Sequence, residues 1–466
     1  MAIRVEKDLL GLRDVPAQAY WGVQTLRAVE NFPITGTQIS NHPYLVKGLA
    51  TVKLACAAAN YELGVLPQTQ FEAIEVACTQ VIAGQFHDQF IVDVIQGGAG
   101  TSTNMNANEV IANLALEHLG KEKGDYSVVN PNDHVNLSQS TNDAYPTALK
   151  VALLYNIADL QAALTYLEDA FSAKAIEFHS YLKMGRTQLQ DAVPMTLGQE
   201  YRAFANMVAQ ARRRLADAAT ELYAINLGAT AIGTGINAPS GYAQLVATKL
   251  ADLSGLPVFT APDLIQATVD VSGFVDVSSA LKRAAVQISK ISNDIRLLSS
   301  GPRAGLGEIN IPATQAGSSI MPGKVNPVIP EVVSQVAFEI IGNDVTIAMA
   351  AEAGQLQLNA FEPVIFYKLD TGISHLAAAC RTLVDNCING TTANTDYLRG
   401  TVDNSIGLVT ALNPILGYQA STSVAAEALT SGRNVAEIVL ERNLMSAEDL
   451  AEVLSAEKLA NLAPKA

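Results

Sequence analysis

Cysteine is scarce in this sequence, with four residues among 466, at positions 56, 78, 380 and 387. No Cys-x-x-Cys pair occurs and no histidines stand at zinc-binding spacing around them, which excludes the usual thiolate metal centres. Cys380 and Cys387 are seven positions apart in a helical pattern, about 10 Å along a helix axis, which is too far for a disulfide. We therefore expect no metal site, buried free thiols and a reducing compartment.

Positive charge is also in short supply. Lys and Arg number 30 against 45 Asp and Glu, the formal net charge is -15, and the one basic cluster is Arg212–Arg214. Without a basic patch, nucleic acid and an anionic membrane surface would both repel the chain. The chain is charged from Arg4 onward without an apolar signal segment, and its longest uncharged stretch, 222–248, is rich in Gly, Asn, Thr, Ser and Pro. We expect a soluble, cytoplasmic protein that binds neither nucleic acid nor a membrane.

Aromatic residues are few, at 6%, although 49% of the residues are hydrophobic. Much of the hydrophobic content is alanine and leucine, which favour helices packed closely on helices. Five segments carry apolar residues at alternating spacings of four and three, the pattern of a helix buried along one seam. They are 153–171, 197–225, 277–298, 332–358 and 369–387. Such long segments predict a mainly α fold around a central bundle of five helices.

The fourth segment, 332–358, carries only three charged residues. A helix so apolar around its circumference must be surrounded by protein, which suggests that bundles from several chains pack together. Turn signals break the chain before residue 142, and shorter helical patterns begin after residue 396. We predict a mostly helical N-terminal domain (1–141), a central long-helix bundle (142–396) and a small helical C-terminal domain (397–466).

Four polar stretches interrupt this apolar architecture. They are GGAGTSTNMNANE (97–109), NPNDHVNLSQSTNDAYP (130–146), GRTQLQDAVPM (185–195) and GSSIMPGKVNPVIPE (317–331). A single hydroxyl or amide before a helix is commonly a cap, and Asn326 followed by Pro327 fits one. Capping does not explain Ser140–Asn142, because a helix start needs one cap. Convergent neutral donors with the lone cation Lys324 suit a small carboxylate, although an isolated lysine is more often a surface residue.

The last stretch resembles the signature loop of the aspartase/fumarase superfamily, whose members add or remove a group across the double bond of fumarate. The resemblance extends over seven ordered blocks of the chain. They run from DLLG..DVPAQAYWGVQTLRA through QGGAGTSTNMNANEV, NPNDHVN.SQSTNDAYPT, GRTQLQDAVPMTLGQE, NLGATAIGTG and SSGPRAGLGEIN to GSSIMPGKVNP. The resemblance implies a three-domain fold whose five-helix bundles assemble into the twenty-helix core of a homotetramer, with three chains contributing to each active site.

Two positions are more similar to the aspartase branch than to the fumarase branch. Fumarases generally have Ser-Ser-Asn-Asp where Ser140–Asp143 reads Ser-Thr-Asn-Asp, and Thr-His in place of Thr187–Gln188. In fumarases that histidine is associated with handling water, together with a glutamate at the place of Glu331, whereas Gln188 cannot accept a proton. The resemblance therefore implies a carbon-nitrogen lyase that deaminates L-aspartate to fumarate and ammonia. The alternatives are a fumarate hydratase, another superfamily lyase with a different leaving group, or a structural protein like the relatives recruited as lens crystallins.

The resemblance also implies roles for ten residues of this sequence. Ser318 would be the catalytic base. The side-chain carboxylate would be held by Thr101, Ser140, Thr141 and Ser319, and the α-carboxylate by Lys324, Asn326 and Thr187. The amino group would be oriented by Asn142 and Gln188. The implied reaction is an anti-elimination through an enediolate (aci-carboxylate) intermediate. It requires no cofactor and no metal in the site, and leaves open whether a divalent cation such as magnesium activates the enzyme.

A serine base is demanding, because lowering its pKa by about five units costs roughly 7 kcal/mol. We expect backbone N–H groups of residues 317–320 and the charge of Lys324 to supply part of this. His134 is the histidine with the strongest claim to a general base role. In this family, however, its segment is mostly structural or a secondary anion site, and the alternative is a hydrogen-bonded histidine at a turn.

Overall fold

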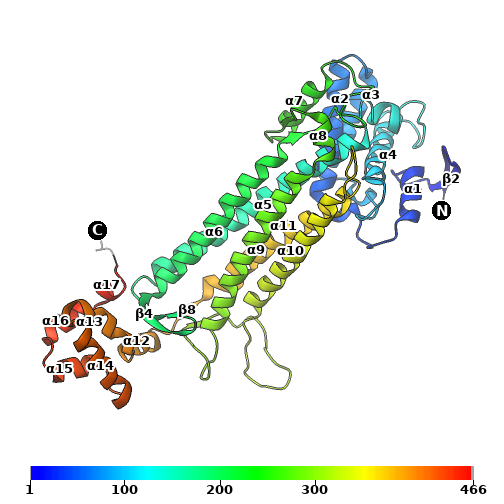
Figure 1. Cartoon of the computed structure of the whole chain (residues 1–466). Helices are drawn as coiled ribbons and strands as arrows, with labels where there is room; N and C mark the ends of the chain where they lie inside the picture. The colour runs from blue at the N-terminus through cyan, green and yellow to red at the C-terminus, as the bar shows by residue number, and fades with distance from the viewer. Residues whose placement is uncertain (1, 463–466) are drawn as a thin grey trace. The chain divides into compact units, whose positions relative to one another are not determined.

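The computed structural model describes residues 2–462, and most of its elements are α-helices (Figure 1). This confirms the mainly α fold class predicted from the apolar spacing. The described residues form two compact units, each assembled from three stretches of the chain. Unit 1 comprises residues 2–162, 213–285 and 338–377, and unit 2 comprises residues 163–212, 286–337 and 378–462. The division into three domains at residues 141 and 396 stays a prediction.

Five long helices each contribute one stretch to unit 1 and one to unit 2. They are α5 (Thr141–Glu177), α6 (Leu197–Ala219), α9 (Ser272–Leu298), α10 (Val328–Glu352) and α11 (Glu362–Asn386). Each predicted segment falls mainly in one of them, so the prediction of five long helices is confirmed. The second segment extends past the end of α6, because Leu222 and Ile225 stay buried in a 3-10 turn and in the short strand β5 (Ala224–Ile225).

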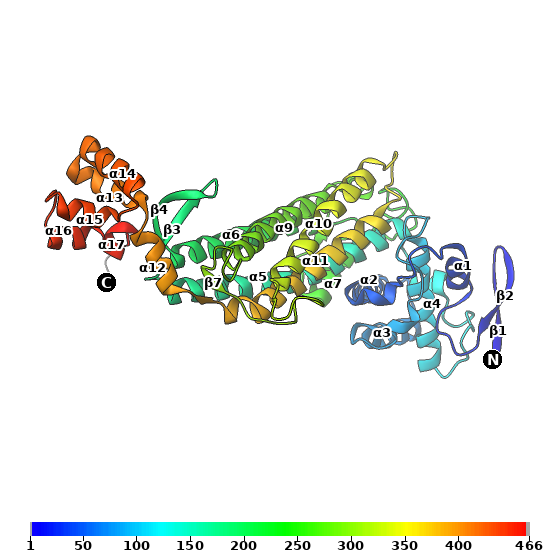
Figure 2. The ribbon, with the colours of Figure 1, turned by 90° about the horizontal axis from the view of Figure 1, so that it is seen from below.

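In unit 1 the stretches of the long helices lie side by side (Figure 2). Polar side chains join them. Asn156 Nδ2 on α5 donates to Asp370 Oδ1 on α11 at 2.7 Å. Ser278 Oγ on α9 donates to Asp344 Oδ1 on α10 at 2.8 Å. Because polar side chains inside a helical bundle must be hydrogen-bonded, such pairs fix which helices are neighbours.

Unit 1 also contains a group of shorter elements. They are β1 (Ile3–Asp8), β2 (Gly11–Pro16), α1 (Val23–Asn31), α2 (Pro43–Glu62), α3 (Gln68–Ile82), α4 (Thr101–His118), a π-helical turn (Pro131–Val135), α7 (Tyr242–Ser254), β6 (Phe259–Thr260) and α8 (Leu264–Val269). Strands β1 and β2 form an antiparallel hairpin, whereas β5 and β6 pair in parallel. Helix α2 packs against α3 and α7, and α3 packs against α4. These contacts bury α2 along most of its length.

Unit 2 combines a second β-hairpin with the C-terminal helices. Its elements are β3 (Leu182–Thr187), β4 (Gln190–Thr196), β7 (Ile309–Asn310), β8 (Thr392–Ala393), α12 (Thr395–Asp403), α13 (Val409–Leu416), α14 (Tyr418–Ser431), α15 (Val435–Glu441), α16 (Ala447–Val453) and α17 (Ala456–Leu459). Strands β3 and β4 pair antiparallel, as do β7 and β8. Leu412, Val424 and Ile438 belong to the small core that the C-terminal helices share.

Helix α10 leaves part of its apolar surface uncovered. Among the described residues it is the one helix that length and composition would allow to cross a membrane. Its Asp344 nevertheless forms an ion pair with Lys282 on α9, which places this part of α10 inside a protein bundle. Phe338, Val345 and Met349 on the same helix remain exposed. A bundle helix with an uncovered apolar face is typical of one that packs against a further chain.

Candidate active site

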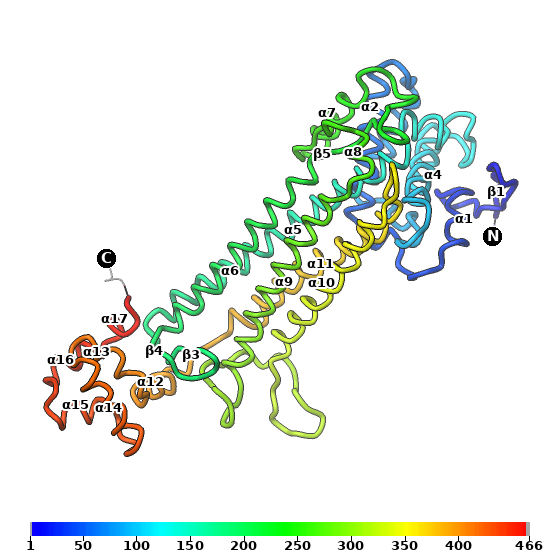
Figure 3. The backbone as a smooth tube through the Cα atoms, in the orientation of Figure 1, coloured from blue at the N-terminus to red at the C-terminus, as the bar shows by residue number. Residues whose placement is uncertain are grey.

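The signature loop (residues 317–327) lies in unit 2, on the stretch of chain between β7 and α10 (Figure 3). Within it, Ser318 Oγ accepts hydrogen bonds from the backbone N–H groups of Ile320 and Met321, at 3.2 and 2.9 Å. Hydrogen bonds to an ionised acceptor are stronger than those to a neutral one, so both donors would favour the deprotonated hydroxyl. The Ile320 N–H is one of the backbone donors expected from residues 317–320, whereas the second donor, the Met321 N–H, lies outside that range.

The two ends of the signature loop are held together by Gly317. Its N–H donates to Lys324 O at 2.8 Å, and its carbonyl accepts from Asn326 Nδ2 at 2.7 Å. A Cβ at Gly317 would lie 2.4 Å from Lys324 O, so the loop requires glycine here. The Asn326 amide therefore closes the loop, a contact that its position before Pro327 did not predict, and keeps its second N–H for a ligand.

Two further predicted ligands of the signature loop are exposed. Ser319 and Lys324 both have exposed side chains. Within residues 2–462 the Lys324 ammonium takes part in no ion pair. The loop thus presents a hydroxyl and a positive charge that no other described group neutralises.

Thr187 and Gln188 lie at the tip of the β3–β4 hairpin in unit 2. Thr187 pairs with Gln190, and the turn between them consists of Gln188 and Leu189, with φ of 54° and 63°. Left-handed backbone at both central positions matches the twist of a two-residue hairpin but is strained for residues other than glycine. The turn leaves the side chains of both Thr187 and Gln188 exposed.

A buried network of charges underlies this hairpin. Glu308, one residue before β7 and fully buried, forms ion pairs with Arg186 and, at 2.7 Å, with Lys183. Lys183 also pairs with Glu200 on α6 at 2.7 Å. Two cations on β3 are thereby bound to the segment that continues through β7 to the signature loop. Sequence spacing did not reveal the network, because Arg186 and Glu308 are 122 positions apart.

The start of α5, in unit 1, carries three of the predicted ligands. Ser140 Oγ accepts from the Asn142 N–H, and Thr141 Oγ1 accepts from Asn104 Nδ2, each at 3.2 Å. A hydroxyl that accepts keeps its own hydrogen, so Ser140 and Thr141 are both free to donate to an anion.

Asn142 and Asp143 connect the start of α5 to residues 228–231. Asn142 Nδ2 donates to Ala231 O at 2.8 Å, which leaves Oδ1 as an acceptor suited to an ammonium group. Asp143 is fully buried and accepts from the N–H groups of Gly228 and Thr230 at 3.0 and 2.8 Å. Burial raises the pKa of Asp143 to about 6.

Thr101 is the first residue of α4 in unit 1. Its hydroxyl donates to Gly98 O at 2.7 Å, so in this structure it does not offer its hydrogen to a ligand. The preceding Gly100 has φ 88°, and a Cβ there would lie 2.3 Å from the Tyr145 ring. The start of α4 is therefore packed directly on α5, and Thr101 must turn away from Gly98 before it can hold a carboxylate.

His134 is part of a turn. Its Nδ1 accepts from the Asn130 N–H at 2.8 Å, and burial lowers its pKa. This confirms the interpretation as a hydrogen-bonded histidine at a turn. In the part of the chain that the structure describes, no three His, Cys, Asp or Glu residues gather as they would around a metal ion.

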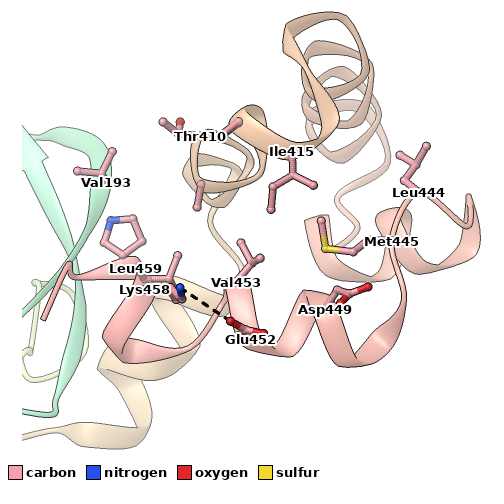
Figure 4. A pocket seen from close by; sticks show the side chains of 13 residues that line it. Val193, Thr410, Ile415, Leu444, Met445, Asp449, Glu452, Val453, Lys458 and Leu459 are labelled. Atoms are coloured by element: carbon pink, nitrogen blue, oxygen red, sulfur yellow. Dashed lines mark ion pairs between the residues drawn. The ribbon is translucent and has the colours of Figure 1, made fainter. Parts of the chain in front are cut away.

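A pocket of about 770 Å³ lies elsewhere in unit 2, in the C-terminal region (Figure 4). It is lined by residues of β4 and of the C-terminal helices, among them Val193, Ile415 and Val453. Lys458 and Glu452, 3.8 Å apart, form an ion pair at its edge. None of the ten predicted site residues lines it, so we do not place the active site there.

The ten predicted site residues divide between the two units. Thr101, Ser140, Thr141 and Asn142 belong to unit 1, and Thr187, Gln188, Ser318, Ser319, Lys324 and Asn326 belong to unit 2. Within unit 1, Asn104 joins α4 to Thr141, and within unit 2, Glu308 joins the hairpin to the segment before the signature loop. Sequence patterns did not single out either joining residue, or the buried Lys53 beside Asn104.

Comparison with known proteins gives a consistent result over the whole chain. A family model described as Lyase matches residues 11–342, and one described as Fumarase C C-terminus matches residues 408–461. The aspartate ammonia-lyase of Pseudomonas aeruginosa is 57% identical, over 99% of this chain and 97% of that protein. A Brucella melitensis crystal structure described as fumarate lyase:delta crystallin, bound to cobalt, superposes with a TM-score of 0.96 at 51% identity, over 98% of this chain and 100% of that one. The class II fumarase of Schistosoma mansoni gives a TM-score of 0.92 at 34% identity, over 98% and 99% of the two chains.

Proposed function

We propose that this chain, which belongs to the aspartase/fumarase superfamily of lyases, is an aspartate ammonia-lyase that converts L-aspartate reversibly to fumarate and ammonia. The observation that carries the choice of substrate is the 57% identity to the Pseudomonas aeruginosa aspartate ammonia-lyase along nearly the full chain. The class II fumarase of Schistosoma mansoni is more distant, at 34%.

Two features of unit 2 favour ammonia over water as the leaving group. Gln188 stands where the resemblance to fumarases would require a histidine, and an amide cannot take up a proton. Glu331, the position expected to assist that histidine, instead lies 3.4 Å from Arg296. In this structure the Glu331 carboxylate is therefore engaged in an ion pair with α9.

Incubating the protein with fumarate, with and without ammonium, tests this choice. We expect loss of the fumarate absorbance only when ammonium is present, and aspartate as the product. Formation of malate in the absence of ammonium would overturn the proposal in favour of a hydratase.

In the proposed reaction Ser318, as its alkoxide, removes a proton from the carbon next to the side-chain carboxylate. The electrons move into that carboxylate to give an enediolate, and ammonia then leaves from the neighbouring carbon. The N–H groups of Ile320 and Met321 support the proposal, because they stabilise negative charge on Ser318 Oγ. The charge of Lys324 would act in the same direction.

The remaining predicted residues would bind the two carboxylates and the amino group. The side-chain carboxylate would be held by Ser140, Thr141, Ser319 and a reoriented Thr101. The α-carboxylate would be held by Lys324, Asn326 and Thr187. The amino group would be oriented by Asn142 and Gln188. Donors that are fixed before the reaction stabilise the growing charge of the enediolate without reorganisation. The free hydrogens of Ser140 and Thr141 and the free Oδ1 of Asn142 support these assignments.

A Lys324→Met variant should raise KM for aspartate and also lower kcat, with kcat/KM reduced by about 100-fold or more. The reason is that the ammonium acts on the α-carboxylate in the ground state and in the transition state alike. Steady-state kinetics measure both constants. An unchanged KM would place Lys324 outside the substrate site.

The proposed assembly is a homotetramer with a twenty-helix core, in which three chains contribute to each active site. The uncovered apolar face of α10 supports it. The proposed chemistry requires no cofactor, and the proposed location is the cytoplasm. A mass measured in solution that corresponds to a monomer at assay concentration would overturn the assembly.

A further inference from the structure

Lys53 on α2 is a buried cation whose hydrogen-bond partners are all neutral. Only 1% of its surface is exposed. Its Nζ donates to Asn104 Oδ1, Asn136 Oδ1 and Gln139 Oε1 at 2.7, 3.1 and 2.7 Å. These contacts use all three donors of the ammonium group. Among the residues from 2 to 462, no carboxylate forms an ion pair with it.

An ammonium group buried in this way normally has a carboxylate partner, because three amide dipoles do not cancel a full charge. The titratable groups that act on Lys53 are Asp143 on α5, Cys56 on α2 and Cys78 on α3. Asp143 directs its oxygens to backbone N–H groups instead. Burial raises the pKa of Cys56 to about 12 and also raises that of Cys78, so neither thiol carries a compensating charge.

The amides around Lys53 lead directly to the predicted anion site. Asn104 accepts from Lys53 through Oδ1 and donates through Nδ2 to Thr141 Oγ1, at 3.2 Å. Gln139, the second close acceptor, is the residue before Ser140. A single side chain, that of Asn104, therefore connects the ammonium group to the Thr141 hydroxyl at the start of α5. Hydrogen bonds in a chain polarise one another, so the cation makes the Asn104 N–H a better donor and the Thr141 hydroxyl a better donor in turn.

We propose that Lys53 is a positioning residue that supplies, through Asn104, the counter-charge for a dicarboxylate bound at Ser140 and Thr141. The missing anionic partner of the buried ammonium is then the substrate itself. The charge is of most use when the side-chain carboxylate becomes a doubly negative enediolate in a site of low dielectric. This inference rests on the proposed function, because it takes its anion from that reaction.

Binding of succinate, an unreactive dicarboxylate, measured by calorimetry at several pH values is the first test. Burial lowers the pKa of Lys53 to about 8. An anion prefers the protonated form, so the Kd of succinate should rise about tenfold per pH unit above that pKa in the free protein. Lys53→Met should bind more weakly at neutral pH and lack this rise. Lys324→Met should retain the rise, which separates the two lysines.

A purely structural role for Lys53, tying α2 to α4 and to residues 136–139, predicts a different outcome. Gln139→Glu separates the two roles, because it gives Lys53 an internal carboxylate and leaves the contact between Asn104 and Thr141 in place. A structural cation would tolerate the new ion pair. As counter-charge to substrate, a neutralised Lys53 should lower kcat/KM for aspartate by about 100-fold. Gln139→Met, which loses the same amide without adding charge, is the matched control, with a loss of less than about tenfold expected.

The inference is overturned if the Kd of succinate is the same below and above the pKa of Lys53, or if Gln139→Glu turns over aspartate as well as Gln139→Met does. A protein that deaminates aspartate but binds no succinate overturns it as well. If Lys53→Met does not fold, two measurements still test the inference. They are the pH dependence of succinate binding to the wild-type protein and the comparison of Gln139→Glu with Gln139→Met. Absence of any aspartate deamination by the wild-type protein would instead refute the proposed function, and the succinate titration would still report on Lys53.

Discussion

The Ser318→Ala variant is expected to lose about 10⁴-fold in kcat for aspartate deamination, because the alkoxide that takes the proton from carbon no longer exists. Fold and assembly should be retained. The two N–H groups that now bond to Ser318 Oγ, from Ile320 and Met321, belong to exposed residues and would bond to water instead. The rate of fumarate release gives kcat. Thermal unfolding tests whether the fold is retained, and the mass in solution tests whether the assembly is retained.

Ser446→Ala is a matched control for this variant. Its hydroxyl, at the start of α16, also accepts a backbone N–H three residues on, from Asp449 at 3.1 Å. Loss of that cap should cost about 1 kcal/mol of stability and leave kcat unchanged. If Ser318→Ala behaves as Ser446→Ala does, with near-normal turnover, the base is a different residue.

Replacing Glu308 with glutamine is expected to be the most damaging change to unit 2 outside the predicted ligands. Removing one partner of a buried ion pair typically costs about 3–5 kcal/mol, because the other charge stays buried without compensation. Here Arg186 would lose its carboxylate and Lys183 would retain only Glu200. We expect a lower melting temperature together with a fall in kcat/KM, since Thr187 and Gln188 are carried by the hairpin that Glu308 anchors.

Hydrogen exchange of the β3–β4 amides reports directly on the hairpin, and it should accelerate in Glu308→Gln. Glu441→Gln is the control, because Glu441 pairs with Arg433 at the surface of the same unit and exposed pairs contribute about 0–1 kcal/mol. Equal effects of the two substitutions would mean that the Glu308 network does not anchor the hairpin.

The long helices were predictable because their apolar seams repeat over many turns, and one such seam is buried in each of them. At the end of α6 the apolar spacing continues beyond the last helical residue, and the side chains that follow it are still buried. Leu222 and Ile225 continue the seam of α6, yet they lie in a 3-10 turn and a short strand. Periodicity therefore identified which side chains are buried more reliably than it identified where α6 ends.

The candidate site was predictable only in part. Ser318, Lys324 and their companions follow from a resemblance over seven sequence blocks, whereas the contacts that shape the site are long-range. Lys53 contacts Asn104 and Gln139 from 51 and 86 positions away. In the sequence it is one of two lysines in α2, and only the folded chain shows that its charge has no ionic partner among the described residues.

The four buried cysteines have a consequence for handling the protein. Burial raises the pKa of Cys56, Cys380 and Cys387 to about 12, so their sulfur atoms stay protonated and poorly nucleophilic at neutral pH. Alkylating reagents and peroxide then reach a thiolate only when helices separate. The rate of thiol modification therefore measures how often the native molecule opens transiently, and no engineered probe is required.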